Sequence, residues 1–280
     1  MFLMLNRIRK IVTAYFQRPH LNMLNATSDG AFGNSIIIEV VGFPGIGKTT
    51  LLSEILNQGT EKELGFKSRN DLKKLLSNES LQRQILQIAD ESNFDLGIYE
   101  NLVQKKLLAL WADKALSFKR KVALQKFFMH CITIDIFGKL GCGRKGILLD
   151  EGLFHNFQSE LVAICEEELA DNPLSLSLSL SLERWFANRL IINLVGSMED
   201  VIDRQIKRRI GYLSGETTKK SLLNDLNEQE LSLLYLDYFK KNKKLMTFMD
   251  HINVKYITLS SEQTARENAR LVLGFIRNKI

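Results

Sequence analysis

The chain has few of the residues that would indicate a cross-linked or metal-stabilised protein. Its 280 residues include an odd number of cysteines at irregular spacing, namely Cys131, Cys142 and Cys165. That pattern predicts neither a disulfide framework nor a C-x-x-C metal site. The four histidines are scattered, and none has the spacing of metal ligands. We therefore expect reduced thiols and a cytoplasmic protein.

Long apolar runs are also missing. No run reaches the roughly 18 residues that a membrane-spanning helix needs, and no small-residue cleavage site follows the apolar N-terminal stretch. These absences predict a soluble chain that is not exported. Residues 1–17 mix apolar positions with Arg7, Arg9 and Lys10, so contact of this segment with a membrane surface stays open. Packing of the same segment on the domain or on a partner chain is the favoured interpretation.

The composition is that of an ordinary globular protein, and the net positive charge favours anionic ligands or partners. Hydrophobic residues make up 45% of the chain and charged residues 25%, which fits one α/β domain with an insertion. The formal net charge of +6 suits phosphorylated ligands, nucleic acid and anionic membranes equally well. Charge by itself therefore selects no partner, and the sequence leaves a homodimer open.

Short β-branched runs alternate with segments of helical spacing, which predicts a doubly wound parallel α/β sheet with three αβα layers. The runs expected to be strands are 35–41, 147–150, 190–195 and 254–259. We divide the chain into an N-terminal helix and linker, a main domain, and a helical insertion within that domain, at residues 1–34, 35–280 and about 72–137.

One low-complexity tract stands apart from these elements. Residues 174–182 alternate leucine and serine without interruption, which is the period of a half-buried strand. Pro173 precedes the tract, and this favours a surface excursion or an edge strand over a central strand. The tract contains no residue pattern that indicates chemistry.

The most specific motif is segment 42–49, whose sequence GFPGIGKT matches G-x-x-x-x-G-K-[ST] in full. It lies between the first expected strand and a helix over 49–57, which is the context that a phosphate-binding P-loop requires. Glycines let backbone N–H groups face an anion, Lys48 adds charge at the β and γ phosphates, and the Thr49 hydroxyl ligates Mg²⁺. The motif predicts ATP with Mg²⁺ as the ligand. The residues expected to bind it are Gly42, Phe43, Pro44, Gly45, Ile46, Gly47, Lys48, Thr49 and Thr50.

Two acidic residues end the second expected strand. The run Ile-Leu-Leu leads to Asp150, which has the form of a Walker B carboxylate that holds Mg²⁺ directly or through water. A strand that simply stops at the surface is the other interpretation. For Glu151 two roles stay open, because it either acts on the attacking group or only supports Asp150.

A basic helix is expected over residues 197–210. Its apolar stripe consists of Met198, Val201, Ile202 and Ile206. Arg204 and Arg208 are expected on the other side, where their spacing of four residues puts them on one helix face. They are able to converge on one phosphate group. A solvated basic surface is the competing interpretation.

Taken in order, these motifs resemble the nucleoside and nucleotide kinase branch of P-loop proteins, with thymidylate-kinase-like proteins as the nearest comparison and an uncharacterised P-loop family as another. The resemblance implies that Lys48 and Thr49 are the P-loop pair, that Asp150 is the acid after the third strand, and that Arg204 and Arg208 are lid arginines. It also implies that the base of ATP lies near the turn 259–261. About one hundred residues separate Lys48 from Asp150 without a clear Asp-Arg pair for an acceptor.

Two functions remain from the sequence. The first is a small-molecule kinase that transfers the γ-phosphoryl group of ATP to an unidentified acceptor, with Lys48, Asp150, Glu151, Arg204 and Arg208 as catalytic residues. The second is an ATPase switch of the AAA or signal-transduction type, in which a glutamate activates water. An ABC-type ATPase is set aside, because its signature would precede the acidic strand end. Specific nucleic-acid binding lacks an aromatic-interleaved basic motif.

Overall fold

The structure is a computed structural model of the chain. It describes residues 36–58, 67–68, 97–139, 146–150, 152–169, 182–183, 185–186, 189–215, 223, 226–252 and 254–277. The expectations for residues 1–34, for Glu151 and for all but the last residue of the Leu-Ser tract lie outside these ranges. None of the helices that the structure describes is long and apolar enough to cross a membrane.

The described strands form one sheet in the order β2-β3-β1-β4-β5. The strands are β1 (Ile36–Val41), β2 (Lys67–Ser68), β3 (Gly146–Leu149), β4 (Arg189–Val195) and β5 (Tyr256–Ser260). The pairs β2–β3 and β4–β5 are parallel. Helices flank the sheet, so the predicted parallel α/β architecture is confirmed.

Four of these strands were predicted within one or two residues, and β2 was not predicted. It consists of two residues, paired with Ile147 and Leu148 of β3. Two residues show no periodicity, so pairing with β3 alone makes this segment a strand. By contrast, β1 is apolar except for Glu39 and almost wholly buried, as expected for a central strand of a parallel sheet.

The chain divides into two compact units. The first unit includes β2, most of β3, α6 (Gly97–Ala112) and α7 (Phe118–Lys139). The second unit includes α2 (Lys48–Gln58), α8 (Leu153–Asn156), α11 (Met198–Leu213), α12 (Glu228–His251) and α13 (Ala265–Arg277), with β4 and β5. Helix α9 (Gln158–Leu169) contributes residues to both.

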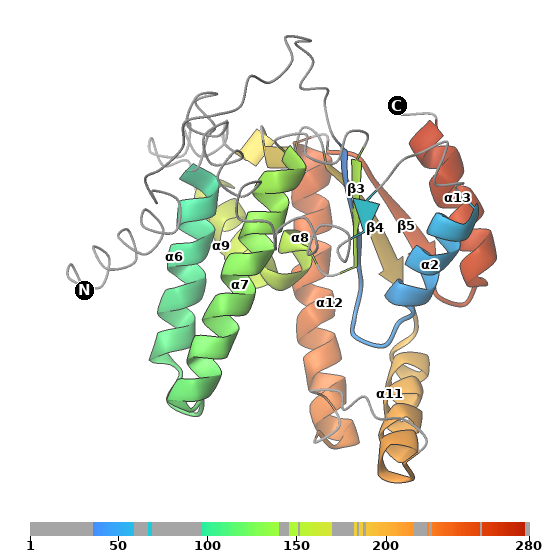
Figure 1. Cartoon of the computed structure of the whole chain (residues 1–280), viewed down its shortest axis with the longest axis horizontal. Coiled ribbons are helices and arrows are strands. Elements are labelled where there is room, and N and C mark those ends of the chain that lie inside the picture. Colours follow the sequence, from blue (N-terminus) through green and yellow to red (C-terminus); the bar gives the residue numbers. More distant parts are fainter. Residues whose placement is uncertain are drawn as a thin grey trace, which may run out of the picture. The chain divides into compact units, whose positions relative to one another are not determined.

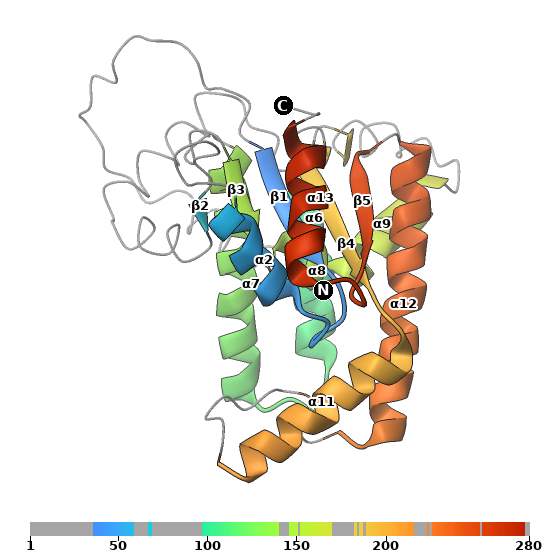
Figure 2. The same ribbon diagram turned by 90° about the vertical axis from the view of Figure 1, so that its right-hand side faces the viewer.

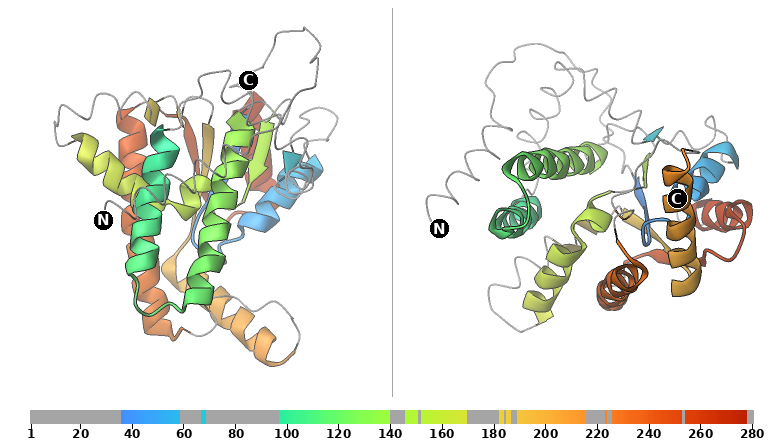
Figure 3. Two further views of the ribbon diagram at one scale, coloured as in Figure 1. Left: turned by 60° about the vertical axis from the view of Figure 1, so that its left-hand side comes forward. Right: turned by 90° about the horizontal axis from the view of Figure 1, so that it is seen from below.

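In the first unit, α6 and α7 pack as a helical hairpin (Figure 3). The helical insertion expected over residues 72–137 is divided in its described part, because α6 ends at Ala112 and Phe118, which begins α7, is 73% exposed. The Asp113 side chain accepts a hydrogen bond from Ala115 N at 2.8 Å, which stabilises a turn. The chain therefore reverses direction where the periodicity alone suggested a single helix.

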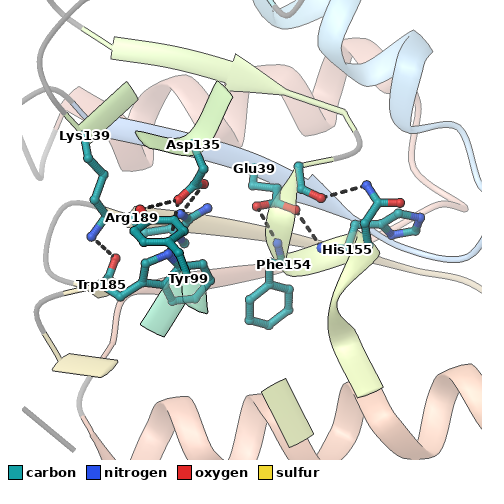
Figure 4. A network of polar contacts seen from close by, with 10 residues as sticks. Glu39, Tyr99, Asp135, Lys139, Phe154, His155, Trp185 and Arg189 are labelled. Carbon is teal, nitrogen blue, oxygen red and sulfur yellow. Dashed lines mark hydrogen bonds and ion pairs between the residues drawn. The ribbon is translucent and has the colours of Figure 1, made fainter. Parts of the chain in front are cut away.

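A fully buried ion pair joins the start of β4 to this hairpin. Asp135 of α7 pairs with Arg189, and both side chains are completely buried. The Asp135 carboxylate also accepts hydrogen bonds from Tyr99 Oη at 2.9 Å and Trp185 Nε1 at 3.1 Å (Figure 4). The Arg189 guanidinium lies 4.0 Å from the centre of the Trp185 ring. Burial and the Asp135 charge raise the pKa of Tyr99, so this phenol stays a donor.

In the second unit, α2 and α13 pack against each other on one side of β4 and β5, and α12 covers the other side (Figure 1). Buried Asn242 of α12 donates to Asn193 Oδ1 of β4 at 2.9 Å. Helix α11 begins soon after β4 and runs across the end of that strand (Figure 2). The Ser197 hydroxyl caps it by accepting from Asp200 N at 3.1 Å. These contacts fix the elements that surround the P-loop.

Asp135→Asn should destabilise the protein by about 3–5 kcal/mol, because it leaves the Arg189 cation buried without its counter-charge. Urea unfolding curves followed by circular dichroism measure the change. Asp237→Asn is the matched control, because Asp237 pairs with Lys241 on the surface of α12, and such a pair contributes about 0–1 kcal/mol. Equal shifts for the two variants would contradict a structural role for the buried pair.

Candidate functional site

The predicted P-loop connects β1 to α2. Gly45 and Gly47 have φ of 92° and 109°, a conformation that side-chain-bearing residues rarely adopt. Leu51 N donates to Gly47 O at 3.0 Å, which makes Gly47 the first carbonyl acceptor of α2. The N–H groups between Gly47 and Leu51, in the first turn, have no carbonyl acceptor within the helix. The loop therefore presents a helix N-terminus of the kind that binds anions.

Lys48 lies folded back over this loop. Its side chain is buried, and Nζ donates to Gly42 O at 2.8 Å and to Phe43 O at 3.3 Å. A lysine at this position of the motif reaches the β and γ phosphates. Its ammonium therefore marks where the terminal phosphate would lie, next to the first half of the loop.

The start of the loop is fixed by aromatic packing. Phe43 is buried and makes edge contacts with Tyr235 and Tyr238 of α12, at ring-centre distances of 5.3 and 5.7 Å. Tyr235 Oη donates to Gly196 O at 2.6 Å, just beyond the end of β4. Burial raises the pKa of Tyr238, so its hydroxyl stays neutral beside the loop. Helix α12 therefore ties the loop to the neighbouring strand.

The proposed magnesium ligands come from two segments of the second unit. Thr49 is exposed in the first turn of α2, and half-buried Asp150 directly follows β3. Among the residues that the structure describes, no three His, Cys, Asp or Glu side chains converge as a metal cluster. Mg²⁺ bound with a nucleotide usually takes only one or two carboxylates from the protein, because phosphates and water complete its shell. The chemistry of Thr49 and Asp150 fits that partial ligand set.

Glu39 is a residue that the sequence reasoning missed. It lies in β1, is fully buried, and its carboxylate accepts hydrogen bonds from Phe154 N at 3.1 Å and His155 N at 2.7 Å (Figure 4). These N–H groups belong to the segment that follows Asp150. A signal for Glu39 was present, because it is the one charged residue in the run Ile-Ile-Ile-Glu-Val-Val.

The same carboxylate explains why Gly152 is glycine. A Cβ at Gly152 would lie 2.5 Å from Glu39 Cδ and 2.6 Å from Oε2. Any larger residue would therefore push the Glu39 carboxylate out of place. Glu39 and Gly152 together set the distance between the strand that precedes the P-loop and the backbone that carries Asp150.

Helix α11 lays three polar side chains along the loop. Arg204 donates from Nη1 to Ile46 O at 3.2 Å, and Gln205 donates from Nε2 to Pro44 O. Arg208 is exposed, and its Nη1 lies 3.5 Å from the point that a Cβ of Gly45 would occupy. The two arginines singled out in the sequence thus lie against the phosphate loop. Their action on a phosphoryl group stays a prediction.

Gln205 was also missed, although its position was informative. Positions 198, 201, 202 and 205 form one helical stripe, and three of them are apolar. A buried glutamine in the fourth position requires a polar partner, which the loop supplies. The turn 259–261, expected near the base of ATP, lies beside this region, because Arg204 Nη2 donates to Ser261 O at 3.4 Å.

Gly152→Ala should disturb the candidate magnesium site, because the added methyl group collides with the Glu39 carboxylate that holds the backbone after Asp150. We expect the affinity for MgATP to fall by about tenfold or more, which corresponds to about 1.4 kcal/mol of binding free energy. The affinity for ATP without metal should change less. Gly274→Ala in α13 is the control, since its Cβ would meet nothing within 4 Å. Calorimetric titrations with and without Mg²⁺ measure both variants, and unchanged MgATP affinity in Gly152→Ala would show that the Glu39 contact does not set the site.

Comparison with known proteins gives one family match and a weak structural similarity. A model of the NB-ARC domain matches residues 22–122, which is less than half of the chain. No curated protein matches the sequence significantly. Deoxyadenosine kinase from M. mycoides with bound dCTP is 15% identical at a TM-score of 0.38, over 88% of this chain and 100% of that one. The same enzyme with bound dATP is 14% identical at a TM-score of 0.37, over 86% and 100%.

These solved structures differ from the chain at about 85% of the aligned positions, and the chain's own fold and loop define the site. A parallel sheet, a complete G-x-x-x-x-G-K-T motif between a buried strand and a helix, and a match to a family of this class agree with one another. Over the described residues, the chain has the parallel sheet and the phosphate-binding loop that P-loop NTPases have.

Proposed function

We propose that this chain binds ATP with Mg²⁺ on residues 42–50 and transfers the γ-phosphoryl group to a small-molecule acceptor. The observation that carries the proposal is the position of α11, whose Arg204 and Arg208 lie along the loop that would hold the phosphates. Arginines supplied by the same chain at this point are what phosphoryl transfer requires, because charge spreads over the γ-phosphoryl oxygens in the transition state.

The binding step follows from the loop. Backbone N–H groups at the start of α2 hold the phosphates, and the Lys48 ammonium, which bonds Gly42 O and Phe43 O, has a further hydrogen to donate to phosphate oxygens. Thr49 and Asp150 would hold Mg²⁺, which supplies charge neutralisation between the β and γ phosphates when bound. The protein itself holds the loop N–H groups and the Lys48 ammonium in place before the nucleotide binds.

An ATPase switch is the second candidate, and the match of residues 22–122 to the NB-ARC domain supports it. Both functions use the same loop, so the acceptor distinguishes them. Purified protein is incubated with MgATP alone and then with nucleosides, nucleotides or sugars. Slow hydrolysis that one acceptor accelerates, with a phosphorylated product, supports the kinase. Fast hydrolysis that no acceptor changes supports the switch.

Lys48→Ala should weaken ATP binding by about a hundredfold, because the ammonium contributes a charge-assisted contact to the β and γ phosphates. The fold should survive, since the Lys48 ammonium bonds carbonyl groups of the loop. Isothermal calorimetry gives the affinity, and circular dichroism checks the fold. Equal ATP affinity in variant and parent would contradict the P-loop assignment.

Arg204→Ala and Arg208→Ala should each lower kcat and kcat/KM together, because a cation engaged mainly in the transition state affects both. An arginine in this role contributes on the order of a thousandfold or more. Lysine at either position should restore little of the lost kcat, since its ammonium cannot bind phosphate through two N–H groups as the planar guanidinium group does. Steady-state assays at saturating ATP measure these effects.

Arg270→Ala, on the exposed face of α13, is the control for loss of a surface arginine. It should leave kcat unchanged. Parental kcat in both α11 variants would remove the case for a lid and leave the P-loop assignment intact.

A further inference from the structure

Gln205 is built against the P-loop more tightly than either neighbouring arginine. Its side chain is 3% exposed, and its Nε2 donates to Pro44 O. A Cβ at Gly45 would lie 2.1 Å from Nε2 and 3.0 Å from Cδ, so the amide occupies the space over this glycine. The loop and the glutamine therefore fit together only because Gly45 has no side chain.

The other half of this amide has no partner in the described part of the protein. Gln205 Oε1 is buried and accepts no hydrogen bond from any described residue. Leaving a buried acceptor unsatisfied costs free energy, and such groups in native proteins require an explanation. The bond to Pro44 O explains the Nε2 half of the amide, but it leaves Oε1 unexplained. A donor that joins the site with the substrates would satisfy Oε1.

The position of the amide identifies which part of the substrate it meets. Lys48 Nζ, which marks the terminal phosphate, lies 2.8 Å from Gly42 O and 3.3 Å from Phe43 O. Gln205 binds the next carbonyl along the loop, that of Pro44. Arg208 approaches the adjacent Gly45 from the following turn of α11. The amide thus lies at the first half of the loop, the half that Lys48 also contacts, where we expect the terminal phosphate.

The chemistry of the unsatisfied atom narrows the ligand further. Phosphate oxygens are acceptors at neutral pH, so they pair with Lys48, Arg204 and Arg208 and not with a carbonyl oxygen. Oε1 accepts from O–H and N–H donors, so it fits an attacking group that still carries a hydrogen atom. A phosphate monoester that accepts a phosphoryl group is largely dianionic at pH 7 and has no proton to donate. A hydroxyl group or a water molecule does.

We propose that Gln205 Oε1 accepts a hydrogen bond from the O–H group that attacks the γ-phosphorus, and that the acceptor is an alcohol, as in a nucleoside or sugar, and not a phosphate. This inference rests on the proposed function. In the step, the hydroxyl oxygen forms a bond to the γ-phosphorus, the bond from that phosphorus to the β–γ bridging oxygen breaks, ADP leaves, and the hydroxyl proton goes to solvent. The neutral amide orients the O–H group and takes no proton.

Gln205→Met tests the proposal, because methionine keeps the length of the side chain and removes both amide groups. Water serves as the first acceptor, in assays of MgATP hydrolysis at saturating ATP. We expect kcat to fall by about a hundredfold, the effect of misplacing a reacting group, with the melting temperature retained. Binding of ADP with aluminium fluoride, which mimics the transition state with its attacking water, should weaken far more than binding of ATP.

Gln58→Met in α2 is the matched control, because its amide bonds Glu54 and Arg266 O away from the loop. It should change neither kcat nor the binding of ADP with aluminium fluoride. Nucleosides and nucleoside monophosphates are then compared as acceptors for the parent protein. Phosphorylation of a nucleoside hydroxyl, lost in Gln205→Met, is the expected result.

Three results would overturn the inference. If Gln205→Met keeps the parental kcat and only weakens ATP binding, the glutamine only holds the loop in shape through its hydrogen bond to Pro44 O. If monophosphates accept the phosphoryl group and hydroxyl compounds do not, the acceptor class is wrong. If the parent binds MgATP and hydrolyses it while Gln205→Met behaves as Gln58→Met does, only this inference fails. A parent that binds no MgATP contradicts the proposed function as well.

Discussion

The site depends on how the carbonyl groups of the P-loop are satisfied. For the loop to turn its N–H groups toward a phosphate, its carbonyl groups must find donors elsewhere. Lys48 serves Gly42 and Phe43. Helix α11 supplies donors to two further loop carbonyls, through Gln205 on Pro44 and Arg204 on Ile46. The phosphate-binding shape is therefore held before any ligand is bound, which lowers the cost of ordering on binding.

This arrangement makes α11 part of the candidate binding site and not only a neighbouring helix. Its cap at Ser197 and its stripe at Val201 and Ile202 place the following turns along the loop. A displacement of α11 would remove donors from two loop carbonyls at once. Nucleotide binding and the position of this helix should consequently be linked, because each stabilises the geometry that the other requires.

Two buried carboxylates, one in each unit, lie where several donors converge. Glu39 receives two backbone N–H groups from the segment after Asp150. Asp135 receives an arginine, a phenol and an indole. Buried charges are tolerated only when they are paired or hydrogen-bonded in this way. In the second unit, the hydrogen bonds to Glu39 bear on the candidate site, because they fix the backbone that follows Asp150.

The sequence by itself determined the features whose residues are neighbours along the chain. The loop GFPGIGKT, the buried strand before it, the helix after it and the Arg204–Arg208 spacing are all local patterns, and four strands could be predicted from apolar runs. Features that depend on distant partners could not be predicted. Strand β2 exists only through pairing with β3, and the turn after Ala112 interrupts an otherwise helical pattern. The partners of Glu39 lie more than one hundred residues away, as do those of Gln205. Only the tertiary structure decided which buried polar residue meets which donor, because hydrogen bonding depends on distance in space and periodicity reports only the face of an element.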